Sequence, residues 1–246
     1  MTNYLIGNWK MNLLPDEAAS LAKDIAEFSS SAKKTQCGIA PTSLSLSAVV
    51  SAIADSNLWT GAQNAHPKDS GAFTGEISAS MAKAAGCAFA LVGHSERRHV
   101  FSEPQELCTE RSKGVLDQEL KLVYCIGETE AENQSGKTFE VVTEQLLPIL
   151  ELVKNNTSNL LIAYEPVWAI GTGKVATPEI IADITAQINN LVKEQTGKEA
   201  PILYGGSVKP NNYAEIIAID SVQGALVGGA SLQAESFAAL LACSED

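Results

Sequence analysis

The chain has 246 residues, 45% of them hydrophobic and 19% charged, a composition typical of a folded globular protein with one large domain or two small ones. Its net charge of −12 argues against nucleic acid and anionic membranes as partners, and no apolar run approaches the roughly 18 residues that span a bilayer. The five cysteines are scattered without a C-x-x-C pair, and no signal-peptide pattern precedes the first apolar segment. We therefore expect reduced thiols in a cytoplasmic protein, with no zinc site and no disulfide framework.

Strand-like and helix-like segments alternate along the whole chain. The predicted strand and helix pairs are 4–8 with 16–28, 36–40 with 44–54, 58–62 with 78–85, 88–93 with a helix capped at Ser102-Glu103-Pro104-Gln105, 121–126 with 137–153, 160–164 with a helix capped by Thr177, 202–204 with 210–218, and 221–227 with 233–242. Such alternation implies parallel strands joined by helical crossovers. Eight units in one chain predict a single-domain (β/α)8 barrel over residues 1–246, with an open doubly wound sheet as the alternative.

Polar and glycine residues follow the predicted strands at the end where barrels place their active sites. The first strand ends in Asn8-Trp9-Lys10, the fourth in Gly93-His94-Ser95-Glu96, the fifth in Gly127-Glu128, the sixth in Glu165, the seventh in Gly205-Gly206-Ser207 and the eighth in Gly228-Gly229. A cation, an imidazole, a carboxylate and two glycine pairs on one rim suggest a site for a small anionic substrate. Each glycine pair alone is compatible with a tight turn, but two pairs after strands seven and eight favour a phosphate.

The segment after the sixth strand has the features of a lid, predicted near residues 166–174. Pro166 biases Glu165 toward an extended backbone, an apolar stretch follows over 167–170, and Gly171-Thr172-Gly173 supplies conformational freedom. Such a stretch is costly to leave in water, which suggests a loop that closes over the Glu165 carboxylate. The alternative is a capping loop beside an incidental glutamate.

Three other side chains have both a structural and a functional interpretation. His94 is compatible with a satisfied core histidine, yet a nearby helix N-terminus disfavours its protonation, and a neutral ring can donate a hydrogen bond to a carbonyl oxygen. Lys10 is either a surface charge or a cation in the barrel mouth. Glu96 and the following arginines are compatible with an ion-pair network that braces the rim.

Several blocks of the sequence resemble the signature segments of the triosephosphate isomerase family. They are Asn8-Trp9-Lys10-Met11-Asn12, Gly61-Ala62-Gln63-Asn64, Gly71-Ala72-Phe73-Thr74-Gly75-Glu76, His94-Ser95-Glu96-Arg97-Arg98, 164–174, Tyr204-Gly205-Gly206-Ser207-Val208 and 226–232. The resemblance extends from residue 4 to about residue 241. The lid and histidine blocks are specific, whereas the glycine pairs alone would not be.

The resemblance implies a TIM barrel and an isomerase of glycolysis and gluconeogenesis that interconverts dihydroxyacetone phosphate and D-glyceraldehyde 3-phosphate without a cofactor or metal. It implies that Glu165 is the base, that neutral His94 polarises the carbonyl, and that Lys10 stabilises the enediolate and phosphate charge. Asn8 would orient the substrate and Glu96 would support the site. Backbone amides of Gly171, Ser207, Gly228 and Gly229 would hold the phosphate.

The resemblance further implies a homodimer. A long excursion near 65–76 would insert beside the active site of the neighbouring subunit, with Thr74 reaching toward Asn12 and Lys10 there. The net charge of −12 repels a phosphate dianion at long range, but screening over ~8–10 Å leaves Lys10 and local helix N-termini to dominate the field.

Two other functions compete with the isomerase. One is a phosphate-binding aldolase in which Lys10 forms a Schiff base. The other is a non-catalytic scaffold, which would be expected to lack Glu165, His94 or Lys10, and this chain has all three.

The chain departs from the family pattern at two positions. The family usually has an arginine where this chain has Asn189 and an aspartate where it has Gln223, and these are understood to form an ion pair behind the lid. Because both partners are replaced by neutral side chains, no buried charge is left unpaired. We expect the two side chains to approach each other, directly or through one water.

Overall fold

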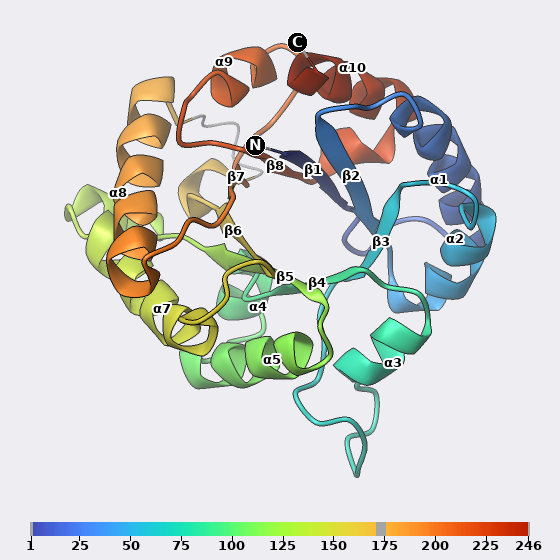
Figure 1. Ribbon diagram of the computed structural model, residues 1–246, viewed down its shortest axis with the longest axis horizontal. Coiled ribbons are helices and arrows are strands. Elements are labelled where there is room, and N and C mark those ends of the chain that lie inside the picture. The colour runs from blue at the N-terminus through green and yellow to red at the C-terminus, as the bar shows by residue number, and fades with distance from the viewer. Residues whose placement is uncertain (1, 171–175, 246) are drawn as a thin grey trace.

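The computed structural model describes residues 2–170 and 176–245, and its strands form a closed ring inside a ring of helices (Figure 1). The strands are β1 (Asn3–Asn8), β2 (Thr35–Ala40), β3 (Trp59–Ala62), β4 (Phe89–Val92), β5 (Lys121–Ile126), β6 (Leu160–Tyr164), β7 (Ile202–Tyr204) and β8 (Gly224–Val227). Neighbouring strands pair in parallel in chain order, and β8 pairs with β1. The predicted (β/α)8 barrel is confirmed, and the open sheet is wrong.

A main helix follows each strand. These helices are α1 (Pro15–Ser29), α2 (Leu46–Ala52), α3 (Ala79–Ala84), α5 (Gln105–Asp117), α7 (Thr138–Val153), α8 (Pro178–Thr196), α9 (Tyr213–Ile217) and α10 (Ala234–Glu245). Short helical pieces lie in the loops: α4 (Ser95–His99), α6 (Glu130–Gln134), η1 (Ser43–Ser45), η2 (Val167–Ala169) and η3 (Gly229–Leu232). The sequence did not predict α6, and α9 is shorter than the predicted helix over 210–218.

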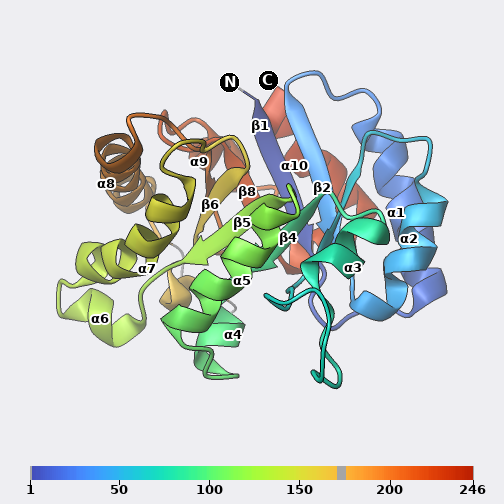
Figure 2. The same cartoon turned by 60° about the horizontal axis from the view of Figure 1, so that its bottom comes forward.

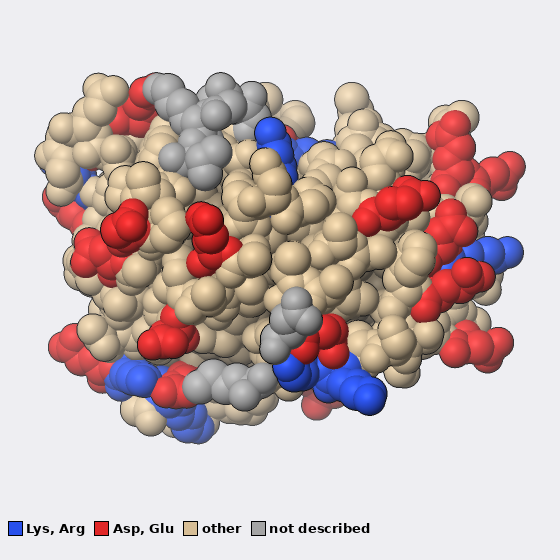
Figure 3. All heavy atoms as spheres, turned by 90° about the horizontal axis from the view of Figure 1, so that it is seen from above, with Lys and Arg blue, Asp and Glu red and all other residues tan. Residues whose placement is uncertain are grey.

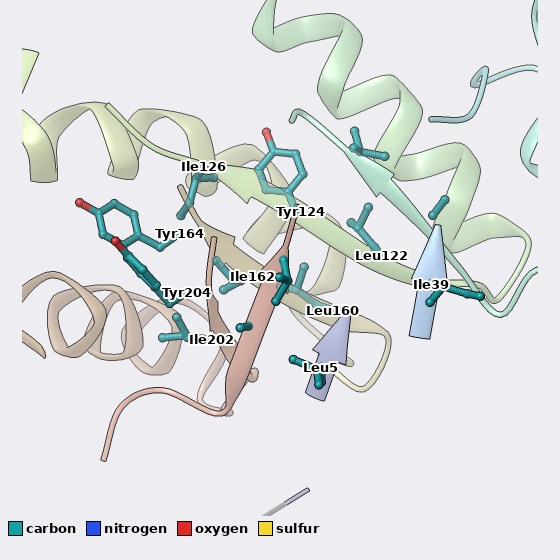
Figure 4. Close-up of a cluster of buried hydrophobic side chains, with 14 of the residues drawn as sticks. Leu5, Ile39, Leu122, Tyr124, Ile126, Leu160, Ile162, Tyr164, Ile202 and Tyr204 are labelled. Carbon is teal, nitrogen blue, oxygen red and sulfur yellow. The ribbon is translucent and has the colours of Figure 1, made fainter. Parts of the chain in front are cut away.

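The barrel has two hydrophobic cores because both faces of each strand are buried. In β6, Leu161 and Ala163 join the cluster inside the barrel, while Leu160, Ile162 and Tyr164 join the cluster between barrel and helices. Figure 4 shows the outer set, with Tyr164 and Tyr204 side by side. This explains the unbroken apolar runs, and the alternation turns the residue after β6, Glu165, toward the barrel interior.

Helix capping agrees with the sequence at α8 and disagrees at α5. The Thr177 side chain accepts a hydrogen bond from the Ile180 N–H, and Pro178 is the first residue of α8, as predicted. The capping box at Ser102 is wrong, because Pro104 is the N-cap residue of α5 and Ser102 has a left-handed φ of 55°. The Gln105 side chain, which would complete that box, instead accepts from Arg98 and donates to the Tyr124 hydroxyl. The Glu103 carboxylate binds Arg97 and Arg111.

Asn189 and Gln223 line one cavity of about 290 Å³, which they share with residues that precede β7 and β8. This cavity therefore lies at the amino ends of the strands, and its predicted position behind the lid is wrong. The Gln223 side chain accepts from the Ile202 N–H (3.0 Å) and donates to the Asp220 carbonyl (3.2 Å). Within the described residues no direct hydrogen bond joins Asn189 to Gln223, since backbone groups occupy the Gln223 amide; a bridging water stays a prediction.

The segment between β3 and α3 protrudes from the carboxyl ends of the strands (Figures 1 and 2). Its base is held by the backbone hydrogen bond from His66 N–H to the Ile77 carbonyl. Phe73 stacks on His66, with ring centroids 4.1 Å apart. Across residues 2–170 and 176–245, no helix has the length and apolarity needed to cross a membrane.

Candidate active site

A cavity of about 690 Å³ opens at the carboxyl ends of the strands, where the sequence placed the site. Its lining includes the predicted residues Asn8, Lys10, His94, Glu165, Ser207, Gly228 and Gly229. The fold brings them together because inward-facing positions recur every second residue along each strand. Gly171 lies outside the described residues, and Glu96 lines a neighbouring cavity instead.

The Glu165 carboxylate is buried, with 2% of the residue exposed. Its Oε2 accepts a hydrogen bond from the Ser95 backbone N–H (3.0 Å), and its Oε1 lies 3.2 Å from Nε2 of His94. Gly127 and Gly205 pack against this residue so closely that an added Cβ would meet the Glu165 carbonyl oxygen at 1.8 Å or its Cγ at 2.7 Å. Glu165 is therefore confined, its backbone by Gly127 after β5 and its side chain by Ser95 after β4 and Gly205 after β7.

The hydrogen bonds of His94 fix its tautomer. Its Nδ1 accepts from the Glu96 backbone N–H (3.2 Å), at the N-terminus of α4. A nitrogen that accepts an N–H carries no proton, so a neutral ring has its hydrogen on Nε2. This hydrogen points at Glu165 and into the cavity, where it can be donated to a substrate oxygen.

Lys10 reaches the cavity through an unusual backbone conformation. Its φ is 51°, a left-handed value, and its N–H donates to Oδ1 of Asn8 (3.0 Å). Its Nζ binds Oε1 of Glu96 at 2.5 Å, and a Cβ on Gly228 would lie 3.6 Å from its Cε. Lys10 thus lies beside the glycine pair, with its charge paired to a carboxylate.

The glycine pairs Gly205-Gly206 and Gly228-Gly229 differ in their surroundings: an added Cβ would clash at the first pair and not at the second. A Cβ on Gly206 would meet the Tyr204 hydroxyl at 2.2 Å, and a Cβ on Gly205 would meet Glu165. These two glycines are explained by close packing. A Cβ on Gly229, the first residue of η3, would meet nothing within 4 Å, so this backbone is open to the cavity. Of the two pairs, Gly228-Gly229 is therefore the one that close packing does not explain.

The described part of the predicted lid is anchored over residues 166–170. Trp168 donates from Nε1 to Oε1 of Glu128 (2.7 Å), and the Tyr164 hydroxyl donates to the same carboxylate (3.2 Å). Burial raises the pKa of Glu128, while hydrogen bonds from Trp168 and Tyr164 oppose that shift. The hinge predicted at Gly171-Thr172-Gly173 lies outside the described residues.

Several groups that shape the site were not predicted. The Ser95 amide holds Glu165, and the Gln63 side chain donates to the Lys10 carbonyl (2.7 Å) and the Ala40 carbonyl (2.9 Å). Gln63 stands at a strand end like the predicted residues, so its position alone could have singled it out. A backbone amide such as that of Ser95 leaves no signal in the sequence. Among residues 2–170 and 176–245, no group of three or more His, Cys, Asp or Glu side chains is arranged to hold a metal ion.

The fold and the site define a barrel with one confined carboxylate, one imidazole and lysine side chains around a cavity at the carboxyl ends of its strands. A family model described as Triosephosphate isomerase matches residues 3–244. Triosephosphate isomerase of Chlorobium chlorochromatii is 45% identical over 242 residues, 96% of each chain, and that of Clostridium perfringens is 41% identical over 245 residues, 98% of each chain. The crystal structure of triosephosphate isomerase from Bartonella henselae matches with a TM-score of 0.90 and 33% identity, covering 100% of both chains.

This chain belongs to the triosephosphate isomerase family and is thus an intramolecular oxidoreductase of the aldose–ketose isomerase class.

Proposed function

We propose that the protein interconverts dihydroxyacetone phosphate and D-glyceraldehyde 3-phosphate through an enediolate, with Glu165 as the base, His94 as the electrophile and Lys10 as the charge stabiliser. The observation that carries the proposal is the 3.2 Å approach of Glu165 Oε1 to Nε2 of a His94 whose Nδ1 is an acceptor. A carboxylate and a neutral N–H donor at that distance can serve adjacent atoms of one small substrate.

In the forward direction, Glu165 removes a proton from C1 of dihydroxyacetone phosphate. The C–H electron pair forms the C1–C2 double bond, and the carbonyl oxygen on C2 becomes an oxyanion that the His94 N–H stabilises. Glu165 then returns the proton to C2, and His94 moves the hydroxyl proton from O1 to O2. In the described conformation Glu165 is held by Ser95, so it must exchange that hydrogen bond for the substrate carbon.

Water exclusion strengthens this chemistry. A carboxylate in water is a weak base for a carbon acid, and a closed lid over 166–174 would raise its basicity and strengthen the fields of Lys10 and His94. Closure would also protect an enediolate that can otherwise expel phosphate.

The substrate phosphate is proposed to bind to backbone amides of Ser207, Gly228 and Gly229, with Gly171 contributing from the lid. The open backbone at Gly229 and the adjacent Lys10 side chain support this placement. Asn8 is proposed to orient the substrate, through its position in the cavity lining and its hydrogen bond to the Lys10 amide. Glu96 is proposed to support the site by holding the Lys10 ammonium group.

A coupled assay on glyceraldehyde 3-phosphate tests the function directly: the dihydroxyacetone phosphate formed is reduced by glycerol-3-phosphate dehydrogenase, and NADH consumption is followed. Activity in the wild type and its loss in Lys10→Met and His94→Ala are expected. The Lys10 Nζ is engaged in an ion pair with Glu96, so borohydride with substrate should trap no Schiff base. A trapped adduct on Lys10 would favour the aldolase.

A homodimer is also proposed. Large apolar side chains are exposed on the loops around Lys10, including Met11 at 93%, Leu44 at 87% and Val100 at 71%. An open cavity of about 590 Å³ lies among them, lined in part by Met11, Asn12 and Phe101. This exposed surface and this cavity match the protruding 65–76 excursion of a second copy, which would bring Thr74 toward Asn12 and Lys10.

Light scattering at micromolar concentration is expected to give twice the chain mass. Met11→Glu, which places a charge in the proposed interface, should give a monomer of much lower activity. A fully active monomeric wild type would contradict the dimer. The buried cysteines Cys37, Cys87, Cys108 and Cys125 suit a reducing compartment, so we propose a cytoplasmic enzyme, which fractionation of the source cells would test.

A further inference from the structure

The active-site cavity contains a second lysine, Lys209, for which the chemistry above has no role. It lines the same 690 Å³ cavity as Lys10, Ser207 and Gly229, and it is exposed to solvent. Within the described part of the chain its Nζ makes no ion pair and no hydrogen bond. Its ammonium group is therefore available to a ligand.

Hydrogen bonds hold the backbone of Lys209 in place, although its side chain is exposed. Its N–H donates to Oδ1 of Asn212 (2.8 Å), and Asn212 Nδ2 donates to the Ser207 carbonyl (3.0 Å). The Lys209 carbonyl accepts from the N–H groups of Asn212 and Tyr213 (3.1 Å each). Lys209 is thus held in one turn with Ser207, which is proposed to bind the phosphate.

The charged side chains around the cavity suggest what Lys209 does. Lys10 and local helix N-termini were expected to dominate the local field, but the Lys10 ammonium group is paired with Glu96 at 2.5 Å. The Glu165 carboxylate adds a negative charge to the same cavity, on a chain of net charge −12. On the face shown in Figure 3, acidic side chains are spread widely and basic ones lie in a few groups. Among the described residues, the formal charges of Lys10, Glu96 and Glu165 sum to one negative charge, which Lys209 offsets.

We propose that Lys209 recruits the substrate's phosphate dianion, raising the association rate and offsetting the Glu165 charge, while Lys10 serves the enediolate. The proposal deepens the proposed isomerase function and rests on it. In physical terms, a unit cation within about one Debye length of a dianion accelerates encounter at low salt and loses that effect when salt shortens the screening length.

The experiment compares the wild type with Lys209→Gln, Lys209→Arg and Lys23→Gln over a range of ionic strength. Lys23 is an exposed lysine on α1 with no ion pair in the described residues, so Lys23→Gln changes the net charge equally, away from the cavity. The quantity measured is kcat/KM for glyceraldehyde 3-phosphate, together with the affinity for inorganic phosphate by equilibrium titration.

Lys209→Gln is expected to lower kcat/KM about three- to fivefold at about 0.01 M ionic strength and less than about 1.5-fold at about 0.5 M, where the screening length is a few ångströms. Phosphate affinity should fall in parallel, Lys209→Arg should restore both quantities, and Lys23→Gln should match the wild type. Lys209→Gln and Lys23→Gln behaving alike at low salt would overturn the proposal. So would a loss that is equal at all salt concentrations, or one that arginine does not restore.

The two proposals fail separately. A wild type without isomerase activity refutes the proposed function, and the phosphate titration still decides whether Lys209 attracts a dianion. An active wild type with an unaffected Lys209→Gln refutes only the role of Lys209.

Discussion

Gln223→Asp tests how this chain dispenses with an ion pair at the amino ends of its strands. The substitution removes the amide donor to the Asp220 carbonyl and shortens the side chain by one methylene. It also adds a carboxylate to a cavity that Asp220, Glu199 and the neutral Asn189 of α8 already line. The nearby cation of α8, Lys193, is ion-paired with Glu199. Both the lost hydrogen bond and the added negative charge should destabilise the fold.

The structure sets the size of the effect. A fully buried charge without its partner costs roughly 3–5 kcal/mol, but Gln223 and Asn189 are only partly buried, and Asp220 and Glu199 are exposed. One lost hydrogen bond costs about 1 kcal/mol, and exposed like charges add up to about 1 kcal/mol. We therefore expect Gln223→Asp to lower the free energy of unfolding by about 1–2 kcal/mol.

Asn189→Arg should not lower the free energy of unfolding. The adjacent cavity of about 290 Å³ has room for a longer side chain, and its carboxylates attract a cation. Alone, this change should be neutral or stabilising by about 0.5 kcal/mol, and combined with Gln223→Asp it should recover about 1 kcal/mol.

Urea unfolding of the wild type, both single variants and the double variant gives the coupling energy. The coupling should shrink in 1 M salt, where the Debye length is about 3 Å. The isomerase activity of all four proteins should be equal, because the cavity lies at the opposite end of the barrel from Glu165. A coupling below about 0.3 kcal/mol at low salt would refute the reasoning and make the two replacements independent.

Three further predictions concern the active-site end of the barrel. Glu165→Asp should lower kcat in the coupled assay by about 10²-fold or more with a much smaller change in KM, because retreat by one methylene misplaces the base; a kcat near that of the wild type would remove Glu165 from its role. Gly127→Ala would place a Cβ 1.8 Å from the Glu165 carbonyl oxygen, and we expect a loss of about 3 kcal/mol in urea unfolding together with a reduced kcat. Gly136→Ala, where the Cβ meets nothing but φ is 72°, is the control and should cost only about 1 kcal/mol; equal losses would refute the packing argument. Burial raises the pKa of Glu103, but hydrogen bonds and charges from Arg97 and Arg111 outweigh it, so the net pKa is lowered. The ionised Glu103 therefore stabilises the fold above the unfolded carboxyl's pKa of about 4.3, and this stabilisation is lost as pH falls through the lower folded pKa. The loss of unfolding free energy in Glu103→Gln should be full near pH 7 and become smaller below about pH 4. A deficit independent of pH would contradict this.

The sequence by itself determined the barrel and predicted most of the residues that line its cavity. Strands buried on both faces need unbroken apolar runs. The runs 121–126 and 160–164 were therefore predicted as strands, with the bounds that β5 and β6 have in the structure. The period of two then decides the direction of the residue after the strand, so Glu165 had to face the interior. The start of α8 was also predicted correctly at Thr177, because capping involves only neighbouring residues: the Thr177 hydroxyl accepts from the Ile180 N–H, and Pro178 begins the helix.

Only the tertiary structure decided how side chains far apart in sequence share partners. The segment Ser102-Glu103-Pro104-Gln105 has the letters of a capping box, but the Gln105 side chain binds Arg98 and Tyr124 instead. Gln223 was expected to meet Asn189, but the backbone groups of Ile202 and Asp220 are nearer. Lys10 and local helix N-termini were expected to supply the field of the cavity, but Lys10 is ion-paired with Glu96, 86 residues away in sequence. Hydrogen bonds and ion pairs form only over distances of a few ångströms. Residues far apart in sequence come that close only when the barrel closes, so a local sequence pattern cannot predict these partners.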